Sequence, residues 1–213
     1  MICVSIGESS AEECIKALEG LDFAEIRLDK IDGLTEDAVH RIFSQPVKLM
    51  ATCRPGTLPE NVRKALLIRA IESGAAFVDI EAESRDEYKK EIIEKARTHN
   101  CTVIISFHNH KRTPTSAELK RTIDRCFESG ADIAKIACMV NSKKDCARLL
   151  GLLDSERKVI VIGMGKMGRI TRIVAPLLGS PFTFVSLRRG KETAEGQMEK
   201  NELEKLMREI CHE

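Results

Sequence analysis

The sequence predicts an α/β protein that folds as a single-domain (β/α)8 barrel, a TIM barrel, over residues 1–213. Short apolar runs recur at intervals of about 25 to 30 residues, each followed by a charged segment with helical periodicity, as parallel strands joined by crossover helices require. Eight such units follow one another without a Pro/Gly-rich linker. The chain is shorter than the roughly 250 residues typical of this fold, so its loops must be brief. A doubly wound open sheet is the alternative, because periodicity counts the strands without showing whether the sheet closes.

Each predicted strand is a short run of mainly apolar residues. In chain order the runs cover residues 2–6, 23–28, 47–53, 76–80, 102–107, 133–137, 159–162 and 182–186. A helix follows each run, and the helices are predicted to begin near Ser10, Thr35, Leu58, Asp86, Ser116, Ser142, Lys166 and Glu199. Several of these starts have a Ser or Thr that can cap the helix. Gly74 and Gly130 each lie between a helix and a strand, where a helix-terminating glycine belongs.

The composition argues against several classes of partner. Lys plus Arg total 34 and Asp plus Glu total 33, a net charge of +1, so the chain has no field to hold nucleic acid or an anionic membrane. One Tyr, seven Phe and no Trp leave few stacking platforms, so we expect a small polar ligand. No apolar run approaches the roughly 18 residues of a membrane span, and no signal-peptide pattern opens the chain.

The eight cysteines indicate the compartment. They lie mostly within apolar runs, and no two form a Cys-x-x-Cys pair. We therefore expect reduced core residues and a cytoplasmic protein, because thiols stay reduced in the cytoplasm.

Polar residues gather at the carboxyl ends of the predicted strands, where barrels and open α/β sheets both place their chemistry. Glu25 and Arg27 are two residues apart on the second strand and so share one side of it. They suit the polar groups of one ligand, or alternatively form a buried ion pair with each other. Arg54 follows the third strand, and Asp79 and Glu81 end the fourth with matching direction.

Lys135 is the most informative residue, because it stands in the middle of the apolar strand 133–137. We expect no adjacent partner for its ammonium group there. Burial penalises the charged form of a lysine and lowers its pKa, which leaves a nucleophilic amine near neutral pH. Such an amine captures a carbonyl substrate as a Schiff base. The alternative is a lysine that extends to the end of its strand or pairs with a neighbouring carboxylate.

His108 directly follows the fifth strand and therefore lies close to Lys135 on the next strand. With an ordinary pKa of about 6.5, a histidine can both take and give a proton near neutrality. A histidine at the end of a strand is otherwise a hydrogen-bonded core residue, and we expect His110 to be its exposed loop counterpart. No His, Cys or carboxylate cluster has metal-ligand spacing, so no metal is expected.

Residues 163–168 match G-x-G-x-x-G between a predicted strand and a predicted helix, which is the pattern of a dinucleotide site. The motif follows the seventh strand rather than the first, and no acidic residue stands where a ribose contact belongs, so this interpretation is disfavoured. Arg188 and Arg189 support it only as partners of a 2′-phosphate. A glycine-rich anion-binding loop is the better interpretation.

Together these residues resemble the type I 3-dehydroquinate dehydratases from end to end. The motifs that carry the resemblance are residues 25–29 (EIRLD), 52–54 (TCR), 106–109 (SFHN), 130–139 (GADIAKIACM), 164–166 (MGK) with 170–172 (ITR), and 193–197 (TAEGQ). Each motif is weak by itself, and their order and placement together make the signal strong.

The resemblance implies dehydration of 3-dehydroquinate to 3-dehydroshikimate, the third step of the shikimate route to aromatic amino acids, without a cofactor. Lys135 would condense with the ring ketone. His108 would help form and hydrolyse the imine, remove the neighbouring proton and return a proton to the departing hydroxyl. Arg172 would bind the carboxylate. The other implied contacts are Glu25, Arg27 and Arg54 on ring hydroxyls, with Ser5, Thr193 and Gln197 completing the pocket and its closing loop.

The chain departs from the family pattern in its loops. After Arg54 it lacks the Glu-Gly-Gly that often follows, so the acid sometimes found near the histidine has no clear counterpart, and Glu60 and Glu81 are the candidates. Thr193 stands where serine is common, and Glu195 where proline is common. The chain begins almost at its first strand, which leaves no room for the hairpin that closes the barrel bottom in longer relatives. The resemblance also suggests a homodimer.

Two other functions are consistent with the same fold. An aldolase would share Lys135 but cleave a carbon–carbon bond, with residues 163–168 available for a sugar phosphate. His108 beside the lysine and the closing residues Gly196 and Gln197 favour elimination instead. A catalytically silent barrel that binds a metabolite or partner would need neither the amine nor the proton shuttle.

Overall fold

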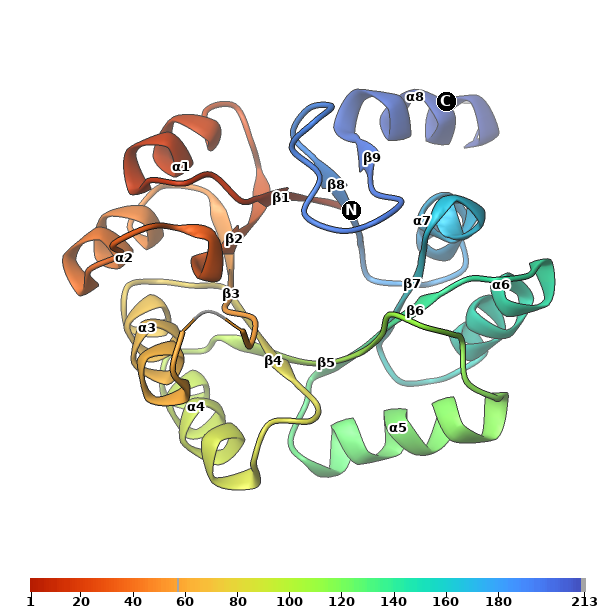
Figure 1. Ribbon diagram of the computed structural model, residues 1–213, viewed down its shortest axis with the longest axis horizontal. Coiled ribbons are helices and arrows are strands. Elements are labelled where there is room, and N and C mark those ends of the chain that lie inside the picture. Colours follow the sequence, from red (N-terminus) through yellow and green to blue (C-terminus); the bar gives the residue numbers. More distant parts are fainter. Residues whose placement is uncertain (57, 212–213) are drawn as a thin grey trace.

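The computed structural model describes residues 1–56 and 58–211, so Thr57 in the loop after Arg54 lies outside the described residues. Nine parallel strands curl into a ring in the order β7–β6–β5–β4–β3–β2–β1–β8–β9, with the helices outside it (Figure 1). The strands are β1 Ile2–Ile6, β2 Phe23–Arg27, β3 Lys48–Thr52, β4 Phe77–Glu81, β5 Thr102–Asn109, β6 Ile133–Met139, β7 Val159–Met164, β8 Thr183–Ser186 and β9 Met198–Glu199. Because the helices cover only the outer face, this is a single-domain (β/α)8 barrel and not a doubly wound sheet.

The helices alternate with the strands. They are α1 Ala11–Ala17, α2 Glu36–Phe43, α3 Glu60–Glu72, α4 Asp86–Thr98, α5 Ser116–Glu128, α6 Lys143–Leu150, α7 Arg169–Leu177 and α8 Lys200–Cys211, with short 3-10 helices η1 Leu28–Lys30, η2 Gly151–Leu153 and η3 Lys166–Gly168. Ser10, Thr35 and Thr115 cap α1, α2 and α5 by accepting backbone N–H groups. Gly74 and Gly130 take positive φ directly after α3 and α5, as the sequence predicts.

None of the described helices combines the length and the apolar character that crossing a membrane demands.

All eight predicted strands are present, and three of them are longer than predicted. β5, β6 and β7 each continue two residues further, because the residues there still pair across the sheet. His108 is opposite Ala137, and Met139 is opposite Met164. His108 therefore belongs to a strand, which holds its backbone more firmly than a loop would. The sequence gives no signal for β9, since two residues are too few for an alternating pattern.

Aromatic rings fill the amino-terminal half of the barrel interior. Phe23, Phe77 and Phe182 contact one another, and Phe184 contacts Phe182, with ring centroids 5.0–5.7 Å apart. The ammonium of Lys48 lies 4.9 Å from the centre of the Phe77 ring. Burying each phenyl ring contributes about 1.5–3 kcal/mol, so this cluster forms a solid floor and leaves space only at the carboxyl ends of the strands.

Directly above this floor the inward-facing positions become polar. Successive inward positions on a strand are two residues apart, so each polar residue follows an apolar one by two. The polar layer comprises Ser5, Glu25, Thr52, Asp79, Ser106 and Lys135, all of them buried. These groups lie in a water-poor interior and must satisfy one another or a bound ligand.

The ring is completed between β7 and β8 by a side chain and a loop, because in the described residues the strand ladder does not run from β7 to β8. The backbone N–H of Gly165, just after β7, donates to the carbonyl of Glu195 at 3.3 Å. The Arg172 guanidinium of α7 donates to the carbonyls of Phe184 at 3.2 Å and Glu195 at 3.4 Å. The segment after β8 therefore seals this side of the barrel.

The glycines of residues 163–168 have a packing role. A Cβ at Gly168 would lie 2.3 Å from the carbonyl carbon of Gly163, and a Cβ at Gly163 would lie 2.8 Å from the Cα of Gly168. The end of β7 and the start of α7 thus touch backbone to backbone, which accounts for both glycines without a nucleotide.

We expect Gly168→Ala to lower the free energy of unfolding by about 1–3 kcal/mol, the usual cost of overpacking, because backbone atoms cannot move aside cheaply. Gly151→Ala is the matched control: this glycine also has negative φ (−64°), and a methyl group added to it would meet no atom within 4 Å. Urea unfolding followed by circular dichroism measures both. An equal effect of the two substitutions would contradict the packing role.

Candidate active site

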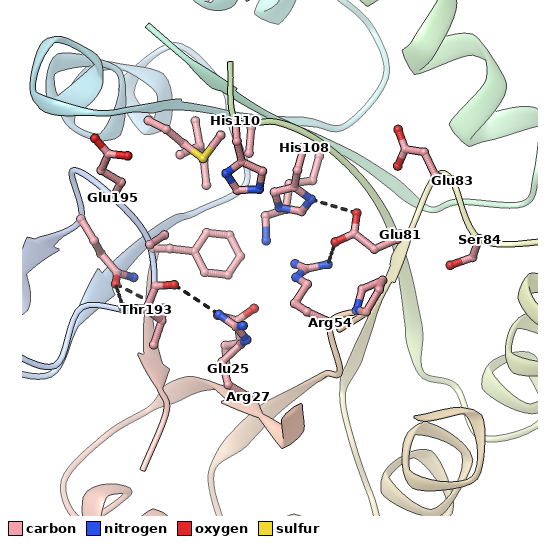
Figure 2. Close-up of a pocket in the computed structure, with 18 of the residues that line it drawn as sticks. Glu25, Arg27, Arg54, Glu81, Glu83, Ser84, His108, His110, Thr193 and Glu195 are labelled. Atoms are coloured by element: carbon pink, nitrogen blue, oxygen red, sulfur yellow. Dashed lines mark hydrogen bonds and ion pairs between the residues drawn. The ribbon is translucent and has the colours of Figure 1, made fainter. Parts of the chain in front are cut away.

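A cavity of about 670 Å³ opens at the carboxyl ends of the strands, above the aromatic floor. The site candidates from the sequence that line it are Glu25, Arg27, Arg54, His108, Lys135, Arg172, Thr193 and Gln197. Figure 2 labels Glu25, Arg27, Arg54, His108 and Thr193 among them. Ser5 does not line it, because its hydroxyl lies beneath the wall in the polar layer. The remaining wall includes Glu81, Glu83 and His110. One face of the barrel thus holds almost the whole predicted constellation.

Glu25 is held by hydroxyl groups and makes no ion pair in the described residues. Its Oε1 accepts from Thr52 Oγ1 at 2.8 Å, and its Oε2 accepts from Ser5 Oγ. The alternative of a Glu25–Arg27 ion pair is wrong, because Arg27 donates through Nε and Nη2 to Asp29 at 3.0 and 2.6 Å. Strand alternation places Glu25 and Arg27 on the same side of β2, but the Arg27 guanidinium is hydrogen-bonded to Asp29 and not to Glu25. Glu25 is therefore a buried carboxylate with both oxygens held by hydroxyl donors at the cavity wall.

Lys135 is buried as predicted, yet the expectation that it has no partner is wrong. Its Nζ donates to Asp79 Oδ2 at 2.9 Å and lies 4.0 Å from the centre of the Phe184 ring. Asp79 is on β4 and Lys135 on β6, so β5 separates them in the sheet. Both side chains point inward, which lets them meet across the interior although their sequence positions give no hint of it.

Asp79 is the central acceptor of the polar layer. Its side chain is fully buried and accepts from Lys135, from Ser106 and from both terminal nitrogens of Arg54. Burial by itself would raise the pKa of Asp79, but the guanidinium of Arg54 and then the ammonium of Lys135 outweigh burial and hold it well below its ordinary value. Asp79 is therefore a carboxylate at neutral pH.

Arg54 joins Asp79 to Glu81. Its Nη1 donates to Glu81 Oε1 at 2.8 Å, and its backbone N–H donates to Asp29 Oδ1 at 3.1 Å. Burial opposes the charge of Arg54, and the two carboxylates more than compensate, so its pKa is raised. A guanidinium can serve two carboxylates at once because its donors lie in a rigid plane.

His108 is hydrogen-bonded to Glu81, with 2.9 Å between its Nδ1 and Glu81 Oε2 (Figure 2). This contact decides between the two acidic candidates, since Glu60 instead pairs with Arg85. Burial and then the nearby charge of Arg54 lower the pKa of His108, although the Glu81 hydrogen bond acts in the opposite direction. The imidazole is therefore neutral at pH 7 and is able to accept a proton.

His110 is exposed as expected, but it also lines the cavity. Its ring is nearly parallel to that of His108, with 6.2 Å between centroids and an angle of 11° between planes. The two imidazole rings therefore lie near each other at the cavity wall.

Arg172 is almost completely buried, and no carboxylate of the described residues pairs with it. It donates only to carbonyl oxygens, and its Nε has no hydrogen-bond partner. Burial lowers the pKa of Arg172 to about 10, helped by the neighbouring charge of Arg169. A buried guanidinium without a counter-ion at the wall of a cavity is suited to an anionic ligand.

The segment after β8 folds over the cavity. Thr193 Oγ1 lies 2.7 Å from Ser5 Oγ, and the Thr193 backbone N–H donates to Gln197 Oε1 at 2.7 Å. Arg27 Nη1 donates to the Thr193 carbonyl at 3.3 Å. A Cβ at Gly196 would lie 2.5 Å from the carbonyl oxygen of Gly165, so glycine is required at this contact. Thr193 and Gln197 are thereby positioned at the mouth.

The sequence predicted where the site residues lie, but not which side chains they would be hydrogen-bonded to. Asp79 and Glu81 are visible as carboxylates at a strand end, and their two-residue spacing correctly puts both in the interior. That Asp79 serves Lys135 while Glu81 serves His108 depends on distances across the barrel. In the described residues no three His, Cys, Asp or Glu side chains gather as metal ligands would.

Comparison with known proteins agrees with this geometry. A family model described as Type I 3-dehydroquinase matches residues 2–212. The chain belongs to the type I 3-dehydroquinase family. The 3-dehydroquinate dehydratase of Methanocaldococcus jannaschii is 35% identical over 220 residues, which cover 98% of each sequence.

Solved structures of 3-dehydroquinate dehydratases share the fold over almost the whole chain. The type I 3-dehydroquinate dehydratase from Clostridium difficile, solved with covalently modified comenic acid, superposes with a TM-score of 0.87 at 25% identity, covering 99% of this chain and 92% of that one. The 3-dehydroquinate dehydratase from Aquifex aeolicus gives a TM-score of 0.84 at 28% identity, covering 99% and 98%. Family membership thus extends over both the barrel and the loops around the cavity.

We expect Asp79→Asn to destabilise this type I 3-dehydroquinase by about 3–5 kcal/mol at pH 7, because it takes a carboxylate from the buried Lys135 and the partly buried Arg54. The pKa of Asp79 is lowered by folding, so its stabilisation is complete above the unfolded-state pKa of about 3.9 and is lost as pH falls through the folded-state value. The deficit of the variant should therefore be constant at higher pH and shrink below about pH 4. Urea unfolding across this pH range measures it.

Asp124→Asn is the control, because Asp124 forms an ion pair with Arg157 at the surface. Such pairs contribute at most about 1 kcal/mol. Equal losses for the two variants would contradict the central role of Asp79 in the polar layer.

Proposed function

We propose that this protein dehydrates 3-dehydroquinate to 3-dehydroshikimate through a Schiff base on Lys135, as the third step of the shikimate pathway. The observation that carries the proposal is the placement of Lys135 and His108 on adjacent strands facing one cavity, in a chain of the type I 3-dehydroquinase family. Ser106 is opposite Lys135, and His108 comes two residues later on the same strand. Two residues of strand span about 6.6 Å, so His108 lies one inward position nearer the cavity mouth than Lys135, and both side chains line the cavity.

The chemistry begins when the Lys135 amine, after losing a proton, attacks the ring ketone. A bond forms between Nζ and the carbonyl carbon, water leaves, and a protonated imine results. The positive imine draws electrons from the adjacent carbon, so His108 can remove its proton. Electrons then move to expel the hydroxyl one carbon further on, which leaves as water with the proton from His108. Water finally hydrolyses the imine and restores Lys135.

The carboxylate of Asp79 supports the charged states of this sequence. It lies 2.9 Å from Lys135 Nζ, so it stabilises first the ammonium and later the protonated imine at the same nitrogen. Since its low pKa prevents it from taking up the proton itself, Asp79 supplies a constant negative charge rather than acting as a base.

Arg172 is proposed to bind the substrate carboxylate. Its guanidinium is buried, lines the cavity and lacks an acidic partner in the described chain. Two parallel N–H donors match the two oxygens of a carboxylate. Ring hydroxyls would then face Glu25, Arg27 and Arg54, and the Thr193–Gln197 segment, stabilised by Ser5, would cover the ligand. The proposed mechanism uses only these side chains and needs no cofactor.

We also propose a cytoplasmic homodimer. Seven cysteines are buried and form no disulfide, which fits a reducing compartment; they are Cys3, Cys14, Cys53, Cys101, Cys126, Cys138 and Cys146. Exposed apolar side chains on and beside α7, namely Met167, Ile170, Leu177 and Leu178, offer a face that a second copy would cover.

Reduction of the protein with borohydride in the presence of 3-dehydroquinate should attach the substrate skeleton, less one water, to Lys135. Intact-mass and peptide mass spectrometry locate the adduct. Lys135→Ala should show no adduct and no 3-dehydroshikimate. Lys89→Ala is the control, because Lys89 is a second buried lysine that lies on α4 and lines no part of this cavity.

Turnover without an adduct would refute the Schiff base. Neither turnover nor adduct in the wild type would refute the substrate. An adduct with carbon–carbon cleavage of another substrate would favour an aldolase.

We expect Arg172→Gln to raise KM for 3-dehydroquinate about 10- to 100-fold, since it removes a charge-assisted pair worth about 1.5–3 kcal/mol. Arg169→Gln should change KM far less, because Arg169 affects Arg172 only through its nearby charge, pairs with Glu202 and lies outside the cavity. Steady-state kinetics of both variants decide the matter. If the two behave alike, the carboxylate binds elsewhere.

A further inference from the structure

We infer that the cavity contains a second anion-binding subsite, in which Arg63 binds a small carboxylate or phosphate ion. Arg63 lies near the start of α3, lines the cavity and is 7% exposed. A side chain on an outer helix that lines the central cavity must point inward. Arg63 is not among the residues proposed to hold 3-dehydroquinate, so the subsite does not depend on the identity of that substrate.

The cavity extends beyond the proposed catalytic residues. Its volume of about 670 Å³ is within the range that holds a drug-sized ligand, whereas the proposed substrate is a single ring with a carboxylate. Figure 2 shows Ser84 beyond Glu81, on the side away from Thr193. We call this part of the cavity, formed by the start of α3 and the loop between β4 and α4, the outer compartment. The residues that line it are Glu60, Arg63, Glu83, Ser84 and Arg85.

The guanidinium of Arg63 has no anionic partner in the described part of the chain. Glu60, three residues before it, is paired with Arg85 instead. Nε of Arg63 is buried and has no hydrogen-bond partner. A buried cation without a counter-ion is unfavourable. The donors of Arg63 are therefore available to a negatively charged ligand.

Packing against Tyr88 does not satisfy these donors. Cζ of Arg63 lies 5.3 Å from the centre of the Tyr88 ring. Such a cation–π contact attracts the charge to the face of the ring, but it uses none of the N–H groups as hydrogen-bond donors to oxygen. The Tyr88 hydroxyl has no hydrogen-bond partner either. Two neighbouring polar side chains at this end of the cavity are thus unsatisfied.

Arg63 and Arg172 share these features on opposite sides of the barrel. Both are buried and line the cavity, and Nε of each lacks a partner. Their helices, α3 and α7, lie on opposite sides of the ring (Figure 1). An anion at Arg63 would therefore be separate from the carboxylate that Arg172 is proposed to bind.

Glu83 is the second carboxylate of the outer compartment. It also lines the groove between α4 and α5, together with Lys89 and Arg125. Burial raises the pKa of Glu83, and the nearby charges of Arg125 and Lys89 act in the opposite direction. The negative charge of Glu83 is thus balanced from the groove, and Arg63 is left as the cation available to an anion.

The guanidinium determines the class of ligand. Two parallel N–H donors match two oxygens of a carboxylate or a phosphate, and the planar group holds both at once. Ser84 lines the same compartment and offers a hydroxyl, which can donate a further hydrogen bond to an oxyanion. The expected ligand is therefore a small oxyanion.

Tyr88 provides a specific test, because it is the one tyrosine of the chain and its ring faces Arg63. The protein is prepared with ¹³C-labelled tyrosine, and the ring signals are followed by NMR. Sodium phosphate, and separately sodium acetate, is added at constant ionic strength, which removes the general effect of salt. The titrations contain no 3-dehydroquinate, so their outcome is independent of the proposed function.

We expect the Tyr88 signals of the wild type to shift saturably, with half-saturation by phosphate at about 1–10 mM, the range of two charge-assisted hydrogen bonds. Arg63→Gln should weaken this binding about 10- to 100-fold. Lys64→Gln is the matched control, because it removes the same charge from the next residue of α3, which pairs with Glu91 and lies outside the cavity. Arg172→Gln should keep the Tyr88 response.

Saturation by either anion supports the subsite, and the ratio of the two affinities shows which group it prefers. A response that never saturates in the wild type would overturn the inference, as would equal effects of Arg63→Gln and Lys64→Gln. Loss of the response in Arg172→Gln would also overturn it, because the anion would then bind only at Arg172.

Arg63→Lys decides the case if Arg63→Gln does not fold. Lysine keeps the charge but lacks the paired planar donors, so undiminished phosphate binding in this variant would contradict the subsite. If the wild type binds phosphate in this way but does not dehydrate 3-dehydroquinate, the proposed function fails and the subsite stands.

Discussion

The polar layer of this barrel depends on the buried carboxylate of Asp79. It contacts two cations, the buried Lys135 and the partly buried Arg54 at the cavity wall, and its negative charge stabilises both. Because Asp79 serves both, the positions of the two cations are linked. Arg54 in turn holds Glu81, and Glu81 holds His108. The proposed nucleophile and the proposed base are therefore fixed through one chain of alternating charges.

The surroundings of this chain determine how strongly it acts. Below it is a floor of phenyl rings, which excludes water and keeps the effective dielectric low. Above it is the cavity, where a ligand replaces solvent. Charges in such a layer interact more strongly than at the surface, and they have little freedom to reorient. Removing these charged groups from water is therefore energetically unfavourable, but it also fixes the positions of their side chains.

Strand periodicity predicted most of this fold and the sidedness of the site. Glu25, Asp79 and Lys135 each follow an inward apolar residue by two, so their direction is readable from the sequence. The pairing of Lys135 with Asp79 cannot be read from the sequence. The two residues are far apart in the chain, and they meet only because β4, β5 and β6 pair side by side in the sheet. The family resemblance identified residues and proposed roles, whereas the replacement of an expected loop acid by Glu81 emerges only from the distances between side chains.

The seam between β7 and β8 joins the architecture of the barrel to access to its interior. Glu195 and Gly196, which lie between the two covering residues Thr193 and Gln197, also contact Gly165 at the end of β7. Moving this segment far from the cavity would therefore break its contacts with the end of β7 and open the wall on that side. A ligand therefore enters by a small displacement of the Thr193–Gln197 segment. A ligand that contacts this segment would also stabilise the closure of the barrel between β7 and β8.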